Sequence, residues 1–150
     1  MLFLFDTNVV LAYLREHPAK DFINQKFRPF VSGNMPVISV VVIGELRSIA
    51  MRNKWGAARL SNLERFTKEF LIADINSEDI LNAYAEIDTF SQGKLAGKPL
   101  GVSARNMGKN DLWIAATATV TGAKLLSADN DFDHLHSTFL DFEKIDLGIS

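Results

Sequence analysis

The chain has 150 residues, of which 47% are hydrophobic and 23% charged, with a formal net charge of −2 at pH 7. This length suits a single compact domain over residues 1–150, and the composition excludes a disordered chain. The absence of cysteine excludes disulfides, thiolate metal sites and cysteine nucleophiles, and it suits a reducing compartment such as the cytoplasm.

The first segment, Met1 to Phe5, is apolar but lacks the basic start and the longer apolar core of a signal peptide. No apolar run reaches the ~18 residues that a membrane helix requires, so we expect a soluble, cytoplasmic protein that has no membrane partner. Leu2–Phe5 is instead typical of a strand that is covered on both faces of a parallel sheet.

Further elements follow in alternation through the first half of the chain. The capping residues after the first strand predict a helix over Val9–Arg15, and Pro18 is tolerated in the first turn of a second helix that reaches about Phe27. A strand is predicted over Val37–Val40, and from Val41 the apolar residues repeat with helical spacing.

In the second half, the pattern predicts three helices, three strands and a loop that is rich in glycine. The helices are expected over Trp55–Phe66, Ser77–Phe90 and Asp111–Thr121, the strands over Phe70–Ala73, Lys124–Ser127 and Phe142–Ile145, and the loop over 93–108. This alternation predicts an α/β fold with three layers, α/β/α, around a central and mostly parallel sheet. Such sheets carry their sites at the carboxyl ends of the strands.

Two acidic residues lie within two positions after predicted strands. Asp6 follows the first strand, and Asp129 follows the strand that ends at Ser127. Because the carboxyl ends of parallel strands meet at one edge of a sheet, both side chains are expected at the same rim. Each also has a purely structural explanation, since Asp6 can be only a helix cap and Asp129 and Asp131 can be only turn residues.

Two more acids are predicted on helices, beside apolar stripes. Helical geometry sets Glu45 about 60° from the centre of its helix's apolar face. Asp111 shares a side with Ile114 and Ala115 and lies near the helix N-terminus, where the dipole favours an anion, although it too can be only a cap. An acid beside a core-facing stripe is costly without a partner, so four such acids suggest one shared site.

Convergent carboxylates repel one another and raise one another's pKa unless a cation is bound. Oxygen-only ligands favour Mg²⁺ or Mn²⁺. Zinc is not expected, because cysteine is absent and His17, His134 and His136 form no zinc-type set; the last two are expected on the surface. A hard divalent ion suits phosphodiester hydrolysis, since it activates and orients a water and offsets charge on the leaving oxygen.

Two stretches contain basic residues and no acid, from Leu46 to Leu63 and from Thr89 to Asn110. Basic side chains near the acids would hold the phosphates of a nucleic acid, while ordinary solvated loops and helix faces are the alternative. The candidates for this contact are Arg47, Arg52, Lys98, Arg105 and Lys109. Trp55 offers a stacking face for a base, although Trp55 and Trp113 are of a type more often found in the core.

Four segments together resemble a known family. Phe5–Val9, Ile43–Leu46, Asn110–Ala118 and Ser127–Phe132, in this order, are similar to the PIN-domain ribonucleases, and among them to the VapC-type toxins of type II toxin–antitoxin modules. The resemblance spans nearly the whole chain. It implies the α/β/α fold and an endoribonuclease that depends on Mg²⁺ or Mn²⁺.

The resemblance also implies roles for individual residues. Metal-binding and catalytic acids of the family match Asp6, Glu45, Asp111 and Asp129, and Asp131 matches a position that assists in some members. Thr7 or Asn8, and Ser127, match polar residues that support the acids through hydrogen bonds, with Ser127 standing where threonine is common. The family further implies an RNA substrate such as tRNA or rRNA, a homodimer, and a cognate antitoxin whose C-terminal segment occludes the cleft.

Two other functions remain open at the level of sequence. A non-catalytic module that binds RNA or another partner can use the same fold, although such a module would have no need of the acids. A phosphatase of the haloacid-dehalogenase type also begins with a strand and an aspartate, but its chemistry needs a second carboxylate two residues later, where this chain has Asn8.

Overall fold

A computed structural model describes residues 1–148 of the chain. Its elements in chain order are β1 (Leu2–Phe5), α1 (Thr7–Leu14), α2 (Ala19–Lys26), β2 (Met35–Ser39), α3 (Val40–Arg52), α4 (Ala57–Thr67), β3 (Leu71–Ala73), α5 (Glu78–Ser91), α6 (Lys109–Thr121), β4 (Lys124–Ser127), the 3-10 helix η1 (Asn130–Leu135) and β5 (Asp141–Lys144). No helix in this part of the chain is long and apolar enough to span a membrane.

The five strands form one sheet in the order β3-β2-β1-β4-β5, and every neighbouring pair is parallel. The central strand β1 is flanked by β2 and β4, so that Leu4 pairs with Val37 on one side and with Leu125 on the other. All three side chains are 0–1% exposed, as expected for strands covered on both faces. The α/β fold with a central parallel sheet, predicted from the sequence, is confirmed.

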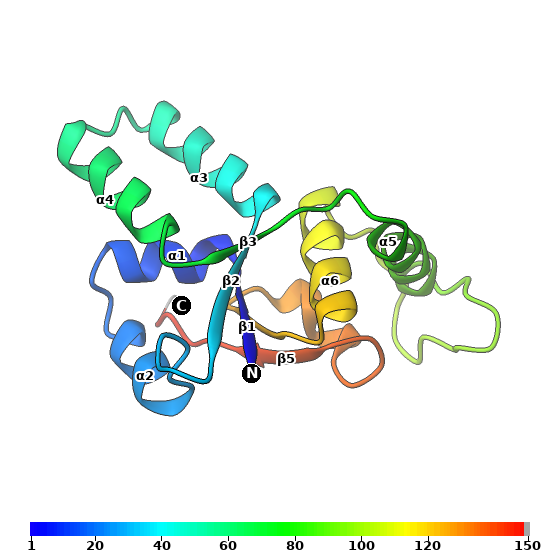
Figure 1. The fold of residues 1–150 in the computed structure, drawn as a ribbon. Coiled ribbons are helices and arrows are strands. Elements are labelled where there is room, and N and C mark those ends of the chain that lie inside the picture. The colour runs from blue at the N-terminus through cyan, green and yellow to red at the C-terminus, as the bar shows by residue number, and fades with distance from the viewer. Residues whose placement is uncertain (149–150) are drawn as a thin grey trace.

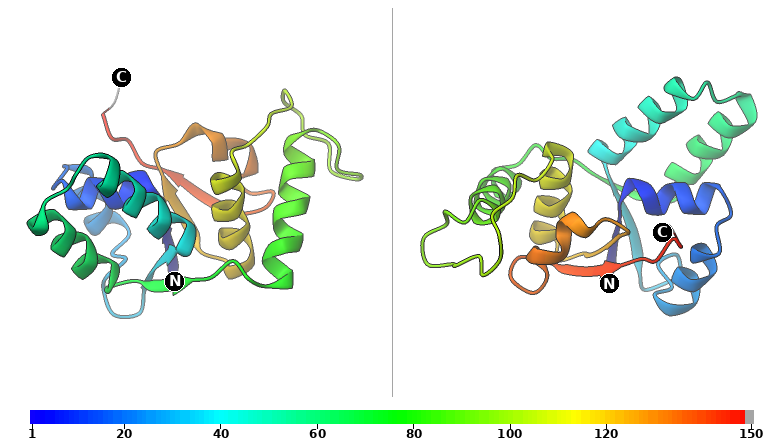
Figure 2. Two further views of the ribbon diagram at one scale, coloured as in Figure 1. Left: turned by 90° about the horizontal axis from the view of Figure 1, so that it is seen from above. Right: turned by 180° about the vertical axis from the view of Figure 1, so that it is seen from behind.

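Helices cover both faces of this sheet. Helices α1 to α4 lie on one side of the sheet, whereas α5, α6 and η1 lie on the other (Figure 1, Figure 2). This division follows from right-handed crossovers, because the chain moves from β1 towards β3 first and then returns to add β4 and β5 beyond β1. The connection between α5 and α6 extends away from the sheet at one end of the molecule (Figure 1).

The predicted elements are all present, with boundaries that differ by a few residues. Helix α1 begins at Thr7 rather than Val9, because the Asp6 side chain accepts a hydrogen bond from the Thr7 N–H and caps the first turn. The helix expected from Trp55 begins at Ala57, after Gly56 at its N-cap. Helix α6 ends where expected, since Gly122 adopts the left-handed conformation (φ 71°) that terminates helices.

Candidate metal centre

The strand order brings two separate segments of the chain to one position at the rim. After β1 the chain continues to β2 on one side, whereas the neighbour on the other side, β4, comes much later in the sequence. A crevice at the carboxyl ends of the strands is expected at such a change of direction. Asp6 follows β1 and Asp129 follows the end of β4 at Ser127, so both lie at this crevice.

Asp6 is buried and held from two sides. Its Oδ1 accepts a hydrogen bond from the Thr7 N–H at 2.8 Å, and its Oδ2 accepts one from the Ser127 hydroxyl at 2.6 Å. The pKa of Asp6 is raised to about 6: burial is the largest cause, these two hydrogen bonds oppose the rise, and the charges of Glu45 and Asp129 add to it. The carboxylate is therefore fixed in direction and close to other acids.

Ser127 connects Asp6 to the residues around it. While its hydroxyl donates to Asp6, the same Oγ accepts from the Asp129 N–H at 3.0 Å and from the Asn8 side-chain amide at 3.4 Å. The Asn8 Oδ1 in turn accepts from the Ala128 N–H at 3.1 Å. The turn after β4 is thus joined to the start of α1 by side-chain hydrogen bonds.

Glu45 enters the same region from α3. Its helix buries Val42, Leu46 and Ala50, and Glu45 lies half-buried beside this face, as helical spacing predicts. The Thr7 hydroxyl donates to Glu45 Oε1 at 3.1 Å. Thr7 therefore contacts two acids of the site, Asp6 through its backbone and Glu45 through its side chain.

Three further carboxylates come together on the other side of the crevice. Oxygen atoms of Asp111, Asp129 and Asp131 all lie within 4.8 Å of one another. Asp111 is in the first turn of α6, and Asp129 caps η1 by accepting from the Asp131 N–H at 2.9 Å. Asp131, which the sequence analysis treated as an auxiliary acid, lies inside this group of three, whereas Asp6 and Glu45 lie outside it.

The charges of the other four acids act on Asp111. Burial, and after it the charges of Asp6, Asp129, Asp131 and Glu45 in that order, together raise the pKa of Asp111 to about 7. This coupling requires the acids to lie near one another at one edge of the sheet. The 5-residue set gathered there is Asp6, Glu45, Asp111, Asp129 and Asp131, hereafter the acidic cluster.

The chemistry of the acidic cluster fits a hard divalent cation. Within residues 1–148, every ion pair uses an acid from elsewhere in the chain, so no lysine or arginine neutralises the cluster. The N-termini of α1 and α6 favour anions there, but such helix effects are limited to about 0.3–2 kcal/mol. Carboxylate oxygens without nitrogen or sulfur ligands favour Mg²⁺ or Mn²⁺, which Asp111, Asp129 and Asp131 are placed to hold.

The histidines are engaged elsewhere. His17 contacts the Leu147 carbonyl oxygen at 2.9 Å, and the ring of His136 accepts from the Phe142 N–H at 3.0 Å. The expectation that His134 lies on the surface is wrong: it is half-buried, and its Nε2 lies 2.7 Å from the hydroxyl of buried Ser91. The cause is tertiary, because η1 packs against α6 and near the end of α5.

The five basic candidates lie in different parts of the structure. Arg52 lines a groove together with Glu45, and Lys109 starts α6 two positions before Asp111. Arg47 instead lines a separate cavity between α3 and α4, so the structure does not bring it to the acidic cluster. The Lys98 ammonium lies over the Phe139 ring, 4.6 Å from its centroid. The backbone N–H of Arg105 donates to the Ser91 backbone carbonyl at 2.8 Å.

The two tryptophans also lie in different parts of the structure. Trp55 lines a cavity with Arg15 and Arg59, away from the acids, and Trp113 lines the groove that contains Glu45 and Arg52. From the sequence, a core position was the favoured prediction for both tryptophans and Trp55 was the alternative stacking face, so neither Trp113 nor Asn110 was predicted at the site. Their position in the first turns of α6, on either side of Asp111 and Leu112, was the available signal.

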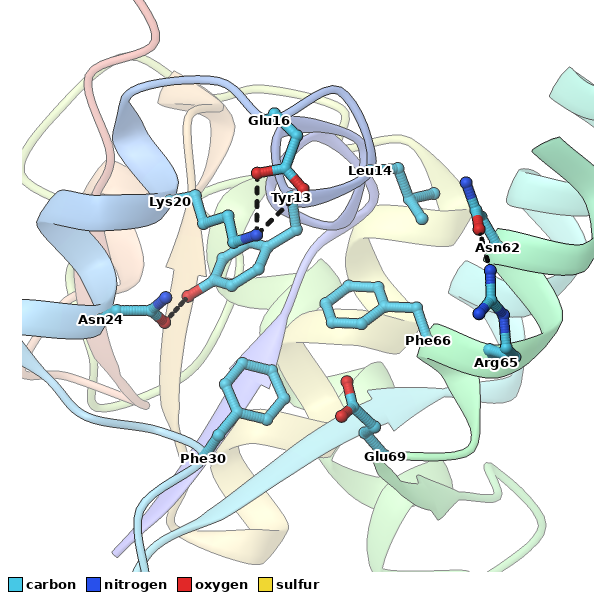
Figure 3. Close-up of a pocket in the computed structure, with 10 residues that line it drawn as sticks. All are labelled: Tyr13, Leu14, Glu16, Lys20, Asn24, Phe30, Asn62, Arg65, Phe66 and Glu69. Atoms are coloured by element: carbon cyan, nitrogen blue, oxygen red, sulfur yellow. Dashed lines mark hydrogen bonds and ion pairs between the residues drawn. The ribbon is translucent and has the colours of Figure 1, made fainter. Parts of the chain in front are cut away.

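A larger cavity, of about 550 Å³, lies apart from the acidic cluster. The rings of Tyr13, Phe30 and Phe66 surround it, with centroids 5.4–5.9 Å apart, and the Tyr13 hydroxyl donates to Asn24 (Figure 3). The ion pair of Glu16 and Lys20 lies at its rim. No acid of the cluster lines this cavity, so its size does not make it the metal centre.

Comparisons with known proteins agree with this fold. A sequence profile of the PIN domain matches residues 3–136. No curated protein matches the chain in sequence. Among solved structures, a chain of VapBC2 from Rickettsia felis, bound to a DNA fragment from their promoter, is 25% identical, with a TM-score of 0.78 over 97% of this chain and 100% of that chain.

Two further structures share the fold at lower identity. A chain of VapBC-1 from nontypeable Haemophilus influenzae is 22% identical, with a TM-score of 0.73 over 96% of this chain and 98% of that chain. A chain of VapBC-5 from Mycobacterium tuberculosis, a member of the VapBC family of toxin–antitoxin systems, is 23% identical, with a TM-score of 0.58 over 96% and 97%.

Proposed function

The chain belongs to the PIN domain family, and from this premise we propose that it is an endoribonuclease that hydrolyses RNA phosphodiester bonds with bound Mg²⁺ or Mn²⁺. The family and the similarity to VapC components support a nuclease in general. The observation that carries the finer proposal is the acidic cluster, in which three carboxylates approach within 4.8 Å without a basic partner.

Each acid has a proposed role that follows from its position. Asp6, Glu45, Asp111 and Asp129 are the proposed catalytic and metal-binding acids, with Asp131 as a further metal ligand. When bound, the cation would activate a water and offset negative charge on the leaving oxygen. Water is then added across one P–O ester bond, and no covalent bond to the protein is required.

Three polar residues would position these acids. Ser127 and Thr7 hold the two oxygens of Asp6, Thr7 also holds Glu45, and Asn8 joins α1 to the turn that carries Asp129. This network fixes the carboxylates before the cation binds, which limits the reorganisation that binding requires. Thr7, Asn8 and Ser127 are therefore proposed as positioning residues.

Basic residues around the cluster would hold the RNA backbone. Lys109 and Arg52 lie on the two helices that contribute Asp111 and Glu45, and Lys98 and Arg105 lie on the segment that leads to α6. Contacts of this kind raise affinity for RNA without selecting a base sequence. Arg47 is the weakest of the candidates, because it lines a different cavity.

We further propose that the chain is the toxin of a toxin–antitoxin pair, acting on tRNA or rRNA in the cytoplasm as a homodimer. The similarity to VapBC structures supports an antitoxin partner. The uncompensated charge of the cluster would attract a basic side chain from such a partner, which would then compete with the cation. A homodimer would place two such acidic clusters, with the basic residues around them, beside one RNA.

The alternatives predict different chemistry. A haloacid-dehalogenase-type phosphatase would need Asp6 as an exposed nucleophile, but Asp6 is 5% exposed and both of its oxygens accept hydrogen bonds. A non-catalytic module would bind RNA and leave it intact. Neither alternative explains five coupled acids without a basic partner.

The test is cleavage of end-labelled RNA with Mn²⁺, with Mn²⁺ plus EDTA, and with the Asp111→Asn variant. We expect cutting only by the wild type with free Mn²⁺, and product ends without a cyclic phosphate. The Asp133→Asn variant is the control, because Asp133 lies on the 3-10 helix that carries Asp131 of the cluster but pairs with Lys144 at 2.7 Å. Binding without cleavage would support the module, and a phospho-enzyme would support the phosphatase.

A further inference from the structure

A groove of about 500 Å³ runs beside the acidic cluster, between α3 and the start of α6. Its size lies within the roughly 300–1,000 Å³ of small-molecule sites. Glu45 lines it, and Asn110, the residue before Asp111, lines its opposite side. A molecule that occupies the groove would therefore be next to the group bound by the acids.

The floor of the groove is apolar and only partly buried. Val41, Ile49, Ile75 and Trp113 line it, and each is of intermediate exposure. The Trp113 indole packs against Tyr84, with ring centroids 4.2 Å apart, so its position is fixed by the protein. A flat aromatic ligand would cover this surface and gain stacking or edge contacts with a preordered indole.

Gly44 is a second, independent indication of a close ligand. It lies inside α3, where glycine costs roughly 0.5–1 kcal/mol relative to alanine. A Cβ atom added at Gly44 would meet no other part of the structure within 4 Å, so protein packing does not require glycine here. Because Gly44 lines the groove, the missing side chain leaves room for a ligand to approach the helix backbone.

Polar groups lie at both ends of this apolar floor. The Asn110 side chain is exposed, so its amide is free to donate and to accept. At the other end, the Arg52 guanidinium donates to Ser48 Oγ at 2.7 Å. An amide near the acids and a fixed cation farther away match the edge of a base and the next phosphate of an RNA strand.

We propose that this groove, formed by Gly44, Ile49, Asn110 and Trp113, is a nucleobase subsite for the unpaired nucleoside next to the scissile phosphate. The subsite rests on the proposed function, since it places an RNA strand across the acidic cluster. Asn110 is its specificity-determining residue, because it alone in the groove presents a free amide beside the acids. Arg52 holds the phosphate on the far side of the base.

Filling the groove at Gly44 tests this directly. Leucine forms helices well, so Gly44→Leu should leave the melting temperature unchanged or raise it by roughly 1–4 °C. It should raise the KM for single-stranded RNA at least tenfold and change kcat less. The matched control is Ala58→Leu, which adds the same side chain to an exposed position of α4 outside the groove. Equal KM values for the two variants would overturn the subsite.

A binding measurement separates the subsite from catalysis. In a Trp55→Phe chain, Trp113 is the remaining tryptophan, and EDTA prevents cleavage. A pentaribonucleotide should quench its fluorescence, whereas an abasic strand with the same phosphates should not. Quenching without any cleavage in Mn²⁺ would keep the subsite and reject the nuclease. Cleavage with no quenching would keep the nuclease and reject the subsite, and equal quenching by both strands would reject the subsite.

The remaining occupant to exclude is a second copy of the chain. If copies meet at this groove, the emission of Trp113 will depend on protein concentration without RNA, and Gly44→Leu will reduce the dimer in light scattering. That result would overturn the proposal. If RNA binds as proposed, the wild type should prefer one base next to the scissile phosphate among oligonucleotides that differ only at that base. Asn110→Ala should reduce this base preference at least fivefold, and Asn110→Gln should restore part of it.

Discussion

The Ser127 hydroxyl donates a 2.6 Å hydrogen bond to Asp6 Oδ2, joining residues 121 positions apart. The same Oγ accepts from the Asp129 N–H and from Asn8. Two acids of the cluster therefore depend on one buried hydroxyl, although Ser127 itself carries no charge.

Removing this hydroxyl should weaken the cation site and the fold together. Ser127→Ala leaves the partly buried Asp129 N–H and the Asn8 amide without this acceptor, so we expect a loss of about 1–3 kcal/mol in urea unfolding. It should also weaken Mn²⁺ binding in calorimetry, because Asp6 is no longer held. Ser127→Thr keeps the hydroxyl and should retain most of the affinity. Unchanged Mn²⁺ affinity in Ser127→Ala would show that Asp6 does not need this bond.

The raised pKa values predict how stability depends on pH without metal. The pKa of Asp6 is about 6 and that of Asp111 about 7, against 3.8 for an ordinary aspartate. The folded state therefore binds more protons than the unfolded state between about pH 4 and pH 7, and its stability falls as the pH rises through this range.

Melting curves in EDTA at about pH 5 and pH 8 measure this dependence. The contribution of the two acids makes the melting temperature higher at the lower pH, and Asp111→Asn should reduce the difference. Saturating Mn²⁺ should reverse the trend, because the cation binds deprotonated carboxylates and stabilises only the folded state. The same pH difference in wild type and Asp111→Asn would contradict the assigned cause.

Asp131 and Asp133 provide a comparison within one short helix. Asp131 lies in the group of three carboxylates, whereas Asp133 forms an ion pair with Lys144. Asp131→Asn should weaken Mn²⁺ binding roughly tenfold or more, and Asp133→Asn should leave it within about twofold. Calorimetric titration of both variants decides this. Equal affinities would remove Asp131 from the site.

Two basic residues should differ in their effect on RNA binding. Lys109 begins α6 beside the cluster, whereas Arg47 lines the cavity between α3 and α4. Lys109→Ala should lower the affinity for RNA and reduce the slope of log affinity against log salt concentration by about 1. Arg47→Ala should change neither quantity. Fluorescence anisotropy over a range of salt concentrations measures both. A larger effect at Arg47 would place the RNA on the other face of α3.

The strands of the sheet and the location of four acids near its edge could be predicted from the sequence, because the patterns that indicate them are local. Apolar runs such as Leu2–Phe5 and Lys124–Ser127 mark strands, and parallel strands bring the residues after them to one edge. Glu45 was located by helical spacing alone. The same spacing separates Arg47 from Glu45 by about 200°, so its absence from the site was available in the sequence.

The features that could not be predicted from the sequence depend on contacts between distant segments of the chain. The burial of His134 comes from its contact with Ser91, on a different helix. The place of Asp131 beside Asp111 depends on how η1 packs against α6. The groove at Gly44 and Trp113 is formed by two helices whose separation no local pattern determines.

The central claim is that the acidic cluster holds a divalent cation. Anomalous diffraction at the manganese edge, from crystals soaked in MnCl₂, tests it most directly. We predict a peak roughly 2 Å from carboxylate oxygens of Asp111 and Asp129, lost in Asp111→Asn crystals. No peak at the cluster under conditions in which wild type cuts RNA, or a lysine or arginine side chain in that position, would contradict the account.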